Sequence, residues 1–275
     1  MKAVLESGNH GSLYRVKAAI TNRPIGKAQK GYELAHEHGI TLHYIDPFSF
    51  PSSEAFYTEV AKAAESIGPD VIGLSGWLKK YSIVHPVLIN PFEGRIWNVH
   101  PAKGSILYRD PQPMLAEARN LKNRHPLEIG TDQIRKRNCE AVPRGEAYRM
   151  IDDGWEMMYW GDDAVFAAEL FGEASTCSII HVVEEKLDTG PIVVSSADAP
   201  ISHGMANKWI WRHAYDRMRD DADGTQGVMK GRCDGRAFCK ALELGAAGRL
   251  RIEGRDVWVD GELTPYGGYK MKADE

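Results

Sequence analysis

Three polar residues in two short segments have side chains that could together carry out acyl transfer. Asn98 and His100 alternate in the stretch 97–101, directly after an apolar run, so the two-residue period of a strand places them on one side. Asp188 lies much further along, in a turn-forming segment between two apolar runs. An amide can donate to a developing oxyanion, an imidazole can move protons, and a carboxylate can stabilise an imidazolium. We therefore expect these three side chains to converge on one cavity.

Each of these residues is also typical of a structural role when it is considered alone. A histidine beside a proline is often a packed residue at the end of a strand, and Asp-Thr-Gly is a common turn sequence. The elements around the residues therefore matter for the interpretation.

The first half of the chain alternates short apolar runs with helical patterns. We expect strands at 16–20, 41–45 and 69–76 and helices at 27–38 and from Ser52 onward. Further along we expect a helix at 163–172, strands at 178–183 and 191–195, a helix at 238–244 and a hairpin at 249–260. This order predicts an α/β fold with a doubly wound, mostly parallel sheet and a C-terminal hairpin, with the ligand crevice at the carboxyl ends of the strands.

Composition favours small-molecule chemistry. Hydrophobic residues make up 43% and charged residues 26% of the 275 residues, which excludes a disordered or collagen-like chain. With 34 basic and 38 acidic side chains the formal charge is −4, so no overall positive field exists to hold nucleic acid or an anionic membrane. The four cysteines form no Cys-x-x-Cys pair, and we expect reduced thiols and no metal centre.

The sequence contains no apolar stretch of about eighteen residues and its first residues lack the apolar run of a signal peptide. We expect a cytoplasmic protein without a membrane partner. Its oligomeric state stays open, with a homodimer as one alternative.

We treat residues 1–275 as a single domain that carries a large insertion at 103–160. This segment breaks the alternating pattern and is rich in charges, prolines and aromatic residues, so it is neither a flexible linker nor a plain surface loop. Because it begins just after His100, we expect it to cover the acceptor side of the cleft.

The sequence resembles the folate-dependent formyltransferases in five blocks that occur in the same order as in that family. These blocks are 22–40, 69–82 (PDVIGLSGWLKKYS), 94–102 (GRIWNVHPA), 161–193 (containing LDTGP) and 248–269. The Asn-x-His and Asp-x-Gly-Pro segments are shared across the family, and the last block is most similar to its purine-pathway members. The resemblance implies a Rossmann-like formyltransferase fold.

The resemblance also implies roles for individual residues. Asn98, His100 and Asp188 match the family's catalytic residues. The folate pocket would be formed by Leu74, Leu78, Lys79, Lys80, Tyr81, Ile96, Val183 and Glu185, with backbone groups of Asp188 also meeting the pterin. The amine substrate would meet Gly8, Asn9, Gly11, Ser12 and His181.

The implied reaction is transfer of a formyl group from 10-formyltetrahydrofolate to a primary amine, with glycinamide ribonucleotide as the main acceptor considered. One alternative is another amine, such as an amino-sugar nucleotide. A second is hydrolysis of the formyl-folate, and a third is a folate-binding module without catalysis. No metal is implied.

One departure from the family concerns phosphate binding. The family's N-terminal strand is followed by a full helix whose Gly-rich start binds the substrate phosphate, but here the strand expected at Val16 begins soon after Ser12. A parallel crossover needs a dozen or more residues, so that helix cannot be present and an antiparallel hairpin is one alternative. Phosphate binding at this loop is therefore left open.

Overall fold

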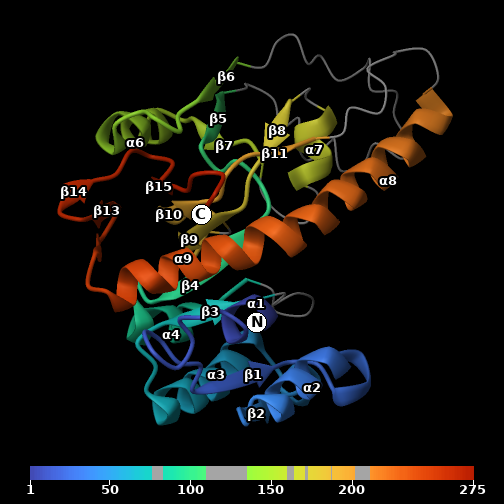
Figure 1. Cartoon of the computed structure of the whole chain (residues 1–275), viewed down its shortest axis with the longest axis vertical. Coiled ribbons are helices and arrows are strands. Elements are labelled where there is room, and N and C mark those ends of the chain that lie inside the picture. The colour runs from blue at the N-terminus through green and yellow to red at the C-terminus, as the bar shows by residue number, and fades with distance from the viewer. Residues whose placement is uncertain (76–82, 110–134, 160–163, 171–172, 187, 202–210) are drawn as a thin grey trace.

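A five-stranded sheet forms the centre of the molecule (Figure 1). The computed structural model describes residues 1–75, 83–109, 135–159, 164–170, 173–186, 188–201 and 211–275. The sheet has the order β15-β10-β9-β4-β3, with bounds Ile72–Leu74 for β3, Ile96–His100 for β4, Ile179–Val182 for β9, Ile192–Ser195 for β10 and Tyr269–Lys270 for β15. One face is covered by the helix α9 (Gly235–Ala246), whose apolar side chains pack on Trp97 and Ile180.

The middle of this sheet is antiparallel. β3 pairs in parallel with β4 and β10 with β15, whereas β9 runs antiparallel to both β4 and β10. The prediction of a mostly parallel sheet is therefore wrong for the residues described. For β9 and β10 the physical reason is their short connection 183–191, because a parallel crossover needs a dozen or more residues. The broader prediction of an α/β fold with parallel portions is confirmed.

The N-terminal part packs beside β3 at the lower end of the molecule in Figure 1. Its elements are α1 (Lys2–Leu5), β1 (Ala18–Thr21), a 3-10 helix (Ile25–Lys27), α2 (Gln29–Glu37), β2 (Thr41–Tyr44), a 3-10 helix (Pro47–Ser49) and α3 (Ser53–Ile67). Residues 6–17 contain no helix, as expected. β1 pairs in parallel with β2, and residues 2–5 are helical, so the alternative of an antiparallel hairpin at the start is wrong.

The ends of α3 follow from its sequence. The Ser52 hydroxyl accepts a hydrogen bond from the Ala55 N–H at 3.1 Å, which satisfies one of the free amides of the first turn. The helix ends at Gly68, whose left-handed φ of 60° is available to glycine at little cost. Between these ends Phe56 and Val60 are buried, which docks the helix on the central sheet beside Ile96.

Between β3 and β4 the chain forms α4 (Pro86–Ile89) and a 3-10 helix (Asn90–Phe92), whose apolar residues join the same cluster. This cluster lies on the face of β4 opposite α9.

The predicted insertion forms its own small sheet but shares its core with the rest of the chain. Its described elements are β5 (Ile106–Arg109), β6 (Arg135–Asn138), α6 (Arg144–Asp152) and β7 (Glu156–Met157), with the strand order β6-β5-β7. Leu107, Cys139 and Ala147 are buried in one cluster with Ile179 of β9 and Ile192 of β10. Removing this segment would therefore remove part of the packing of the central sheet.

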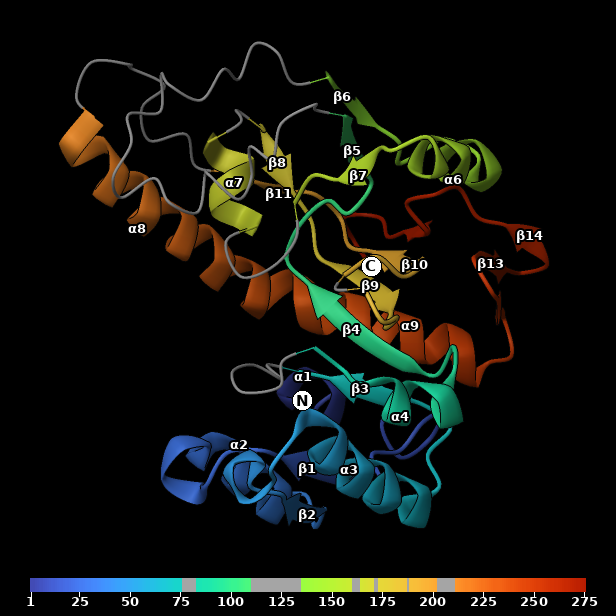
Figure 2. The ribbon, with the colours of Figure 1, turned by 180° about the vertical axis from the view of Figure 1, so that it is seen from behind.

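The C-terminal part contains a long helix that the sequence patterns did not predict. Its elements are α7 (Ala164–Leu170), β8 (Ser175–Thr176), β11 (Ala199–Pro200), α8 (Trp211–Met229), a π-helical turn (Lys230–Asp234) and α9. α8, the π turn and α9 follow one another without a break and run diagonally across the molecule (Figure 2). None of the described helices is both long and apolar enough to cross a membrane.

A hairpin follows α9. β12 (Leu250–Glu253) pairs antiparallel with β13 (Asp256–Val259), which also pairs with β14 (Glu262–Leu263). The two-residue connection is Gly254-Arg255, and Gly254 has the positive φ (56°) that such a turn requires. The structure thus places a hairpin where the sequence predicted one.

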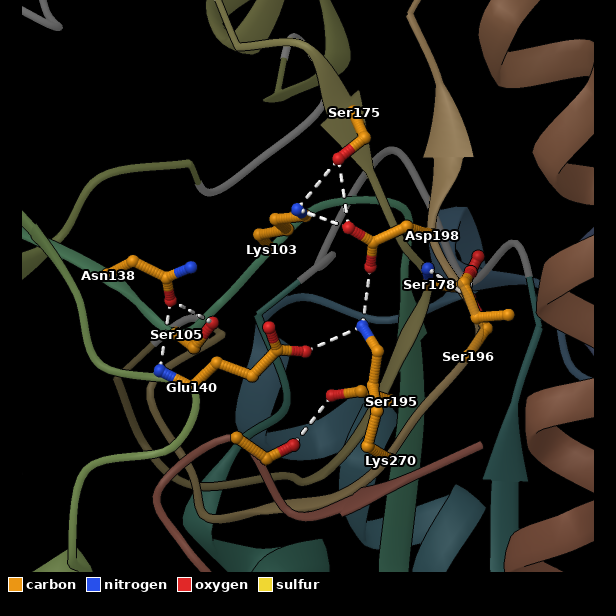
Figure 3. A network of polar contacts seen from close by, with 12 residues as sticks. Lys103, Ser105, Asn138, Glu140, Ser175, Ser178, Ser195, Ser196, Asp198 and Lys270 are labelled. Atoms are coloured by element: carbon orange, nitrogen blue, oxygen red, sulfur yellow. Dashed lines mark hydrogen bonds and ion pairs between the residues drawn. The ribbon is translucent and has the colours of Figure 1, made fainter. Parts of the chain in front are cut away.

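A network of alternating charges joins the insertion to β15 (Figure 3). Asp198 accepts hydrogen bonds from Lys103, Lys270 and the Ser175 hydroxyl, and Lys270 also pairs with Glu140 at 2.6 Å. Burial acts to raise the pKa of Asp198, but the two lysines outweigh it and hold that pKa below its usual range. Asp198 is therefore the shared acceptor of the network.

We expect Asp198→Ala to lower the free energy of unfolding by about 2 kcal/mol, because both lysines lose a charged acceptor. Urea denaturation followed by circular dichroism measures the change. Glu59→Ala is the matched control, since Glu59 pairs with Lys62 on an exposed face of α3, and its effect should stay within about 0.5 kcal/mol. Equal effects of the two substitutions would contradict a stabilising role of the network.

Candidate functional site

The three residues predicted to cooperate lie together at the end of β4 and in the turn after β9. Asp188 reaches both partners: its Oδ1 lies 3.4 Å from Asn98 Nδ2, and its Oδ2 lies 3.6 Å from His100 Nδ1. His100 and Asp188 are buried, and Asn98 is half-buried. The structure brings the three side chains together as expected, and their catalytic roles stay a prediction.

His181 of β9 completes this cluster. The strand register places His181 directly opposite Asn98, so both side chains lie on the same face of the sheet. His181 Nε2 lies 3.3 Å from Asn98 Nδ2 and 3.4 Å from Asp188 Oδ1. The residue was predicted on the amine side, and the structure places it in contact with two of the three predicted catalytic residues.

The turn that carries Asp188 has an unusual backbone. Asp188 has φ 56°, a left-handed conformation that is uncommon outside glycine and is concentrated at functional sites. Two residues later, a Cβ on Gly190 would lie 1.9 Å from the Val182 carbonyl oxygen, so only glycine fits there. The turn therefore packs tightly against β9 and directs Asp188 back over the sheet.

The hydrogen bonds of the two histidines define which ring nitrogen carries a proton. His100 Nε2 lies 3.0 Å from the main-chain oxygen of Tyr159, and His181 Nδ1 lies 2.9 Å from that of Val182. Because a carbonyl only accepts, each of these nitrogens is the N–H donor. In the neutral rings, His100 Nδ1 and His181 Nε2 therefore keep their lone pairs and face Asp188 and Asn98.

The His100 imidazole is biased toward its neutral form. Burial lowers the pKa of His100 below its usual value of 6.5, and His181 lowers it further, while the Asp188 carboxylate opposes the change. The Tyr159 carbonyl and Asp234 of the π turn also oppose it. A neutral imidazole with a free Nδ1 lone pair is available as a base at neutral pH.

The Asn98 amide has the geometry of a donor that can change partners. Its contacts to His181 and Asp188 are 3.3 and 3.4 Å, longer than an ordinary N–H···O bond. Long hydrogen bonds are weak, so an Asn98 N–H can exchange its present partner for an oxyanion with little loss of hydrogen-bond energy. The site thus combines a donor, a neutral base and a carboxylate, which suits the attack of an amine on an acyl carbon.

The residues predicted for folate divide into two groups. Leu74, Ile96 and Val183 lie in one apolar cluster, and Ile96 lies on the same face of β4 as Asn98. Glu185 is exposed, and Leu78, Lys79, Lys80 and Tyr81 lie outside the described residues. Folate binding by all of these residues stays a prediction.

The N-terminal residues predicted for the substrate lie in the loop after α1. Asn9 donates from its amide to Glu243 of α9 at 2.7 Å, and the Ser12 hydroxyl donates to the Asn9 carbonyl. Gly8 and Gly11 have open space around them. No helix begins directly after this loop, so a helix N-terminus is not present there to bind a phosphate.

Sequence reasoning missed two groups near His100. The first is the Tyr159 carbonyl, since a backbone acceptor leaves no signal in the residue type. The second is Asp234, whose carboxylate accepts a hydrogen bond from Ser178, the residue before β9. Asp234 ends a π-helical turn, and such turns are frequent at functional sites but carry no sequence pattern. Among the described side chains, no group of three or more His, Cys, Asp or Glu is arranged to hold a metal ion.

Comparison with known proteins gives one relative in sequence and several in structure. No protein-family model matches the chain. The chain is 30% identical over 109 residues to phosphoribosylglycinamide formyltransferase of Escherichia coli (strain K12), a match that covers 36% of this chain and 50% of that enzyme. The chain thus spans about half the length of this curated relative.

Solved structures share the fold over nearly the whole chain. Phosphoribosylglycinamide formyltransferase from Coxiella burnetii matches with a TM-score of 0.64 at 18% identity, covering 98% of this chain and 92% of that one. Glycinamide ribonucleotide transformylase 1 from Symbiobacterium toebii matches with a TM-score of 0.61 at 22% identity, covering 94% and 87%. The resemblance to the folate-dependent formyltransferases is confirmed, and the fold is the Rossmann-like fold of those enzymes.

A third structure shows that the fold serves another reaction as well. A formyltetrahydrofolate deformylase from Pseudomonas syringae pv. tomato matches with a TM-score of 0.50 at 15% identity, covering 89% of this chain and 56% of that one. Because function depends on the site rather than on the fold, the acceptor must be argued from the residues.

Proposed function

We propose that this protein is an enzyme that transfers a formyl group from 10-formyltetrahydrofolate to a primary amine. The observation that carries the proposal is the buried contact of Asp188 with both Asn98 and His100, in a chain that resembles formyltransferases. Glycinamide ribonucleotide is the acceptor we propose, because the relative in sequence is a phosphoribosylglycinamide formyltransferase. A cytoplasmic location goes with this proposal.

The reaction follows from the site by short steps. The amine nitrogen attacks the formyl carbon, and the carbonyl oxygen becomes an oxyanion that accepts a hydrogen bond from Asn98 Nδ2. His100 takes the proton that the amine loses, and Asp188 stabilises the imidazolium. The oxyanion then re-forms the carbonyl as the C–N bond to N10 of the folate breaks, and N10 takes up the proton held by the His100 imidazolium, which returns His100 to its neutral form as tetrahydrofolate leaves.

The apolar cluster beside the reacting groups supports the choice of donor. Ile96 lies two residues before Asn98 on β4, and Val183 N–H donates to the Ile96 carbonyl at 2.8 Å, so both lie next to the polar cluster. Ile96 and Val183 are themselves buried in this cluster, and Leu74 is half-buried, so of these three residues Leu74 offers accessible apolar surface to an aromatic pterin. The donor is a substrate here, and the proposal needs no metal.

The acceptor is tested with a panel of candidates. The protein is incubated with 10-formyltetrahydrofolate and with glycinamide ribonucleotide, an amino-sugar nucleotide or no amine, and formylated products are identified by mass. Formyl-glycinamide ribonucleotide is the expected product. Formylation of the other amine would support a different transferase, and release of formate without any amine would support the hydrolase.

The pH dependence of kcat/KM tests the role of His100. A protonated imidazole cannot take the amine proton, so activity falls on the acid side. Because burial lowers the pKa of His100, we expect this acid limb at lower pH than an ordinary histidine would give, which is about 6 to 7. Asp188→Asn removes the carboxylate that raises this pKa, so its residual activity should show a limb at still lower pH. A limb unchanged by His100→Ala would assign it to another group.

A further inference from the structure

His100 is held at both ring nitrogens, but by different parts of the chain. Nδ1 faces Asp188 after β9, and Nε2 donates to the main-chain oxygen of Tyr159 at the end of the insertion. In the other neutral tautomer the Nε2 lone pair would face the Tyr159 carbonyl oxygen at 3.0 Å, whereas in this tautomer the Nδ1 lone pair faces the Asp188 carboxylate at 3.6 Å, beyond hydrogen-bond range. The shorter contact favours the proton on Nε2. The position of this one carbonyl therefore decides which nitrogen of His100 is free to act as a base.

The Tyr159 carbonyl is held in place by the side chain of the same residue. Tyr159 is fully buried, and its ring packs with Ala102, Ile106 and Met158. Its hydroxyl donates to Glu173 Oε1 at 2.8 Å. Burial and the Glu173 carboxylate both raise the pKa of Tyr159, so the hydroxyl keeps its proton and remains a donor.

Glu173 is itself fixed from two directions. Lys136 of β6 donates to the same Oε1 at 2.7 Å, and the Glu173 N–H donates to the Ala168 carbonyl at the end of α7. The Glu173 carboxylate, which lies in the segment after α7, thus binds two parts of the insertion. These are Lys136 in β6 and Tyr159 at the insertion's end.

We propose that Tyr159 and Glu173 are positioning residues for His100: the Tyr159–Glu173 hydrogen bond holds the Tyr159 carbonyl where it selects the Nε2-protonated tautomer and leaves Nδ1 as the base. This inference rests on the proposed function for its effect on rate, but the tautomer itself is a property of the protein alone. This role would involve the insertion directly in the chemistry of His100. It is a different role from covering the acceptor side of the cleft, which the sequence led us to expect.

Tyr159→Phe removes the hydroxyl but keeps the ring, so the carbonyl loses its anchor while the apolar packing remains. We expect kcat to fall about 10-fold to 100-fold, since small displacements of a catalytic group are costly, with the KM for folate little changed. Weaker hydrogen bonding at Nε2 should also move the acid limb of kcat/KM to lower pH. The other titratable groups that face His100 (Asp188, His181 and Asp234) are unchanged in this variant.

The tautomer is measured independently of activity. Nitrogen-15 NMR of histidine-labelled protein distinguishes a protonated from an unprotonated ring nitrogen, and His100→Gln assigns the signals. We expect Nε2–H in the unmodified protein and a mixture of tautomers in Tyr159→Phe and Glu173→Ala. Glu173→Gln keeps a side-chain oxygen that can accept a hydrogen bond from the Tyr159 hydroxyl. This variant should therefore show the same NMR signals as the unmodified protein and most of its rate. Tyr148→Phe, which removes a hydroxyl from α6 of the same insertion, should change neither.

Two results would overturn the proposal. One is an Nδ1-protonated His100 in the unmodified protein, and the other is the same tautomer and the same pH profile in Tyr159→Phe and Glu173→Ala as in the unmodified protein. If instead the tautomer responds as expected but no amine is formylated, the positioning role holds and the proposed function fails.

Discussion

Asn98→Ala is expected to lower kcat for formyl transfer by about 10²–10³-fold, the usual cost of losing one oxyanion donor. The reason is that the Asn98 amide donates hydrogen bonds, while His100 serves as the base. The contacts of Asn98 Nδ2 to His181 and Asp188 are long and weak, so the amide can donate to the oxyanion instead. Since this interaction forms only as charge develops, the KM should stay within about twofold. Steady-state kinetics with both substrates varied measures the two constants separately.

The control for this substitution is Asn90→Ala, which removes an exposed amide from the 3-10 helix before β4 and should leave kcat unchanged. Thermal unfolding of both variants checks that the sheet is intact. A kcat for Asn98→Ala equal to that of the unmodified protein would remove Asn98 from the oxyanion role, and an effect confined to KM would make it a binding residue.

The sequence allowed much of the site to be predicted because its residues lie on regular strands. The period of two along β4 places Asn98 and His100 on one face whatever the rest of the chain does. Asp188 was expected beside them, and the left-handed conformation it adopts follows from the tight turn that Gly190 permits. What the sequence could not show were contacts made by backbone atoms, of which the Tyr159 carbonyl is the clearest case.

The fold was less predictable where the sequence lacks a clear helical or strand periodicity of apolar residues. The helix α8 contains Gly224 and Gly227, and two glycines in a helix interior weaken the pattern that a prediction relies on. It also continues through the π turn 230–234, which no propensity scale describes. The direction of β9 was misjudged because its apolar run fits a parallel and an antiparallel strand equally well.

Arg144 shows a further limit, because no sequence pattern around it indicates a buried side chain. In the structure it is only 1% exposed, and its guanidinium donates to the Thr264 and Arg255 carbonyls, the Thr264 hydroxyl and the Ile192 carbonyl of β10. Within the part of the chain that the structure describes, every hydrogen-bond acceptor of the Arg144 guanidinium is a neutral oxygen. Arg144 therefore joins α6 of the insertion to the central sheet through neutral acceptors.

Arg144→Ala is expected to lower the free energy of unfolding by about 3–5 kcal/mol. The substitution leaves buried carbonyls without a donor and opens a cavity where a large side chain was, and each effect is costly by itself. Urea denaturation followed by tryptophan fluorescence gives the change, with the slope of the transition checked for two-state behaviour.

Arg149→Ala is the matched control for Arg144→Ala, because Arg149 lies on the exposed side of the same helix and, among the described residues, its side chain bonds to the Gly145 carbonyl alone. Its effect should stay within about 0.5 kcal/mol. Since Arg144 makes none of the described contacts of Asn98, His100 or Asp188, kcat per folded molecule should be unchanged in Arg144→Ala below its unfolding transition. A loss of stability no larger than that of Arg149→Ala would mean that the insertion rests on the sheet without this link, and a fall in kcat in the folded protein would mean that the link also sets the geometry of the site.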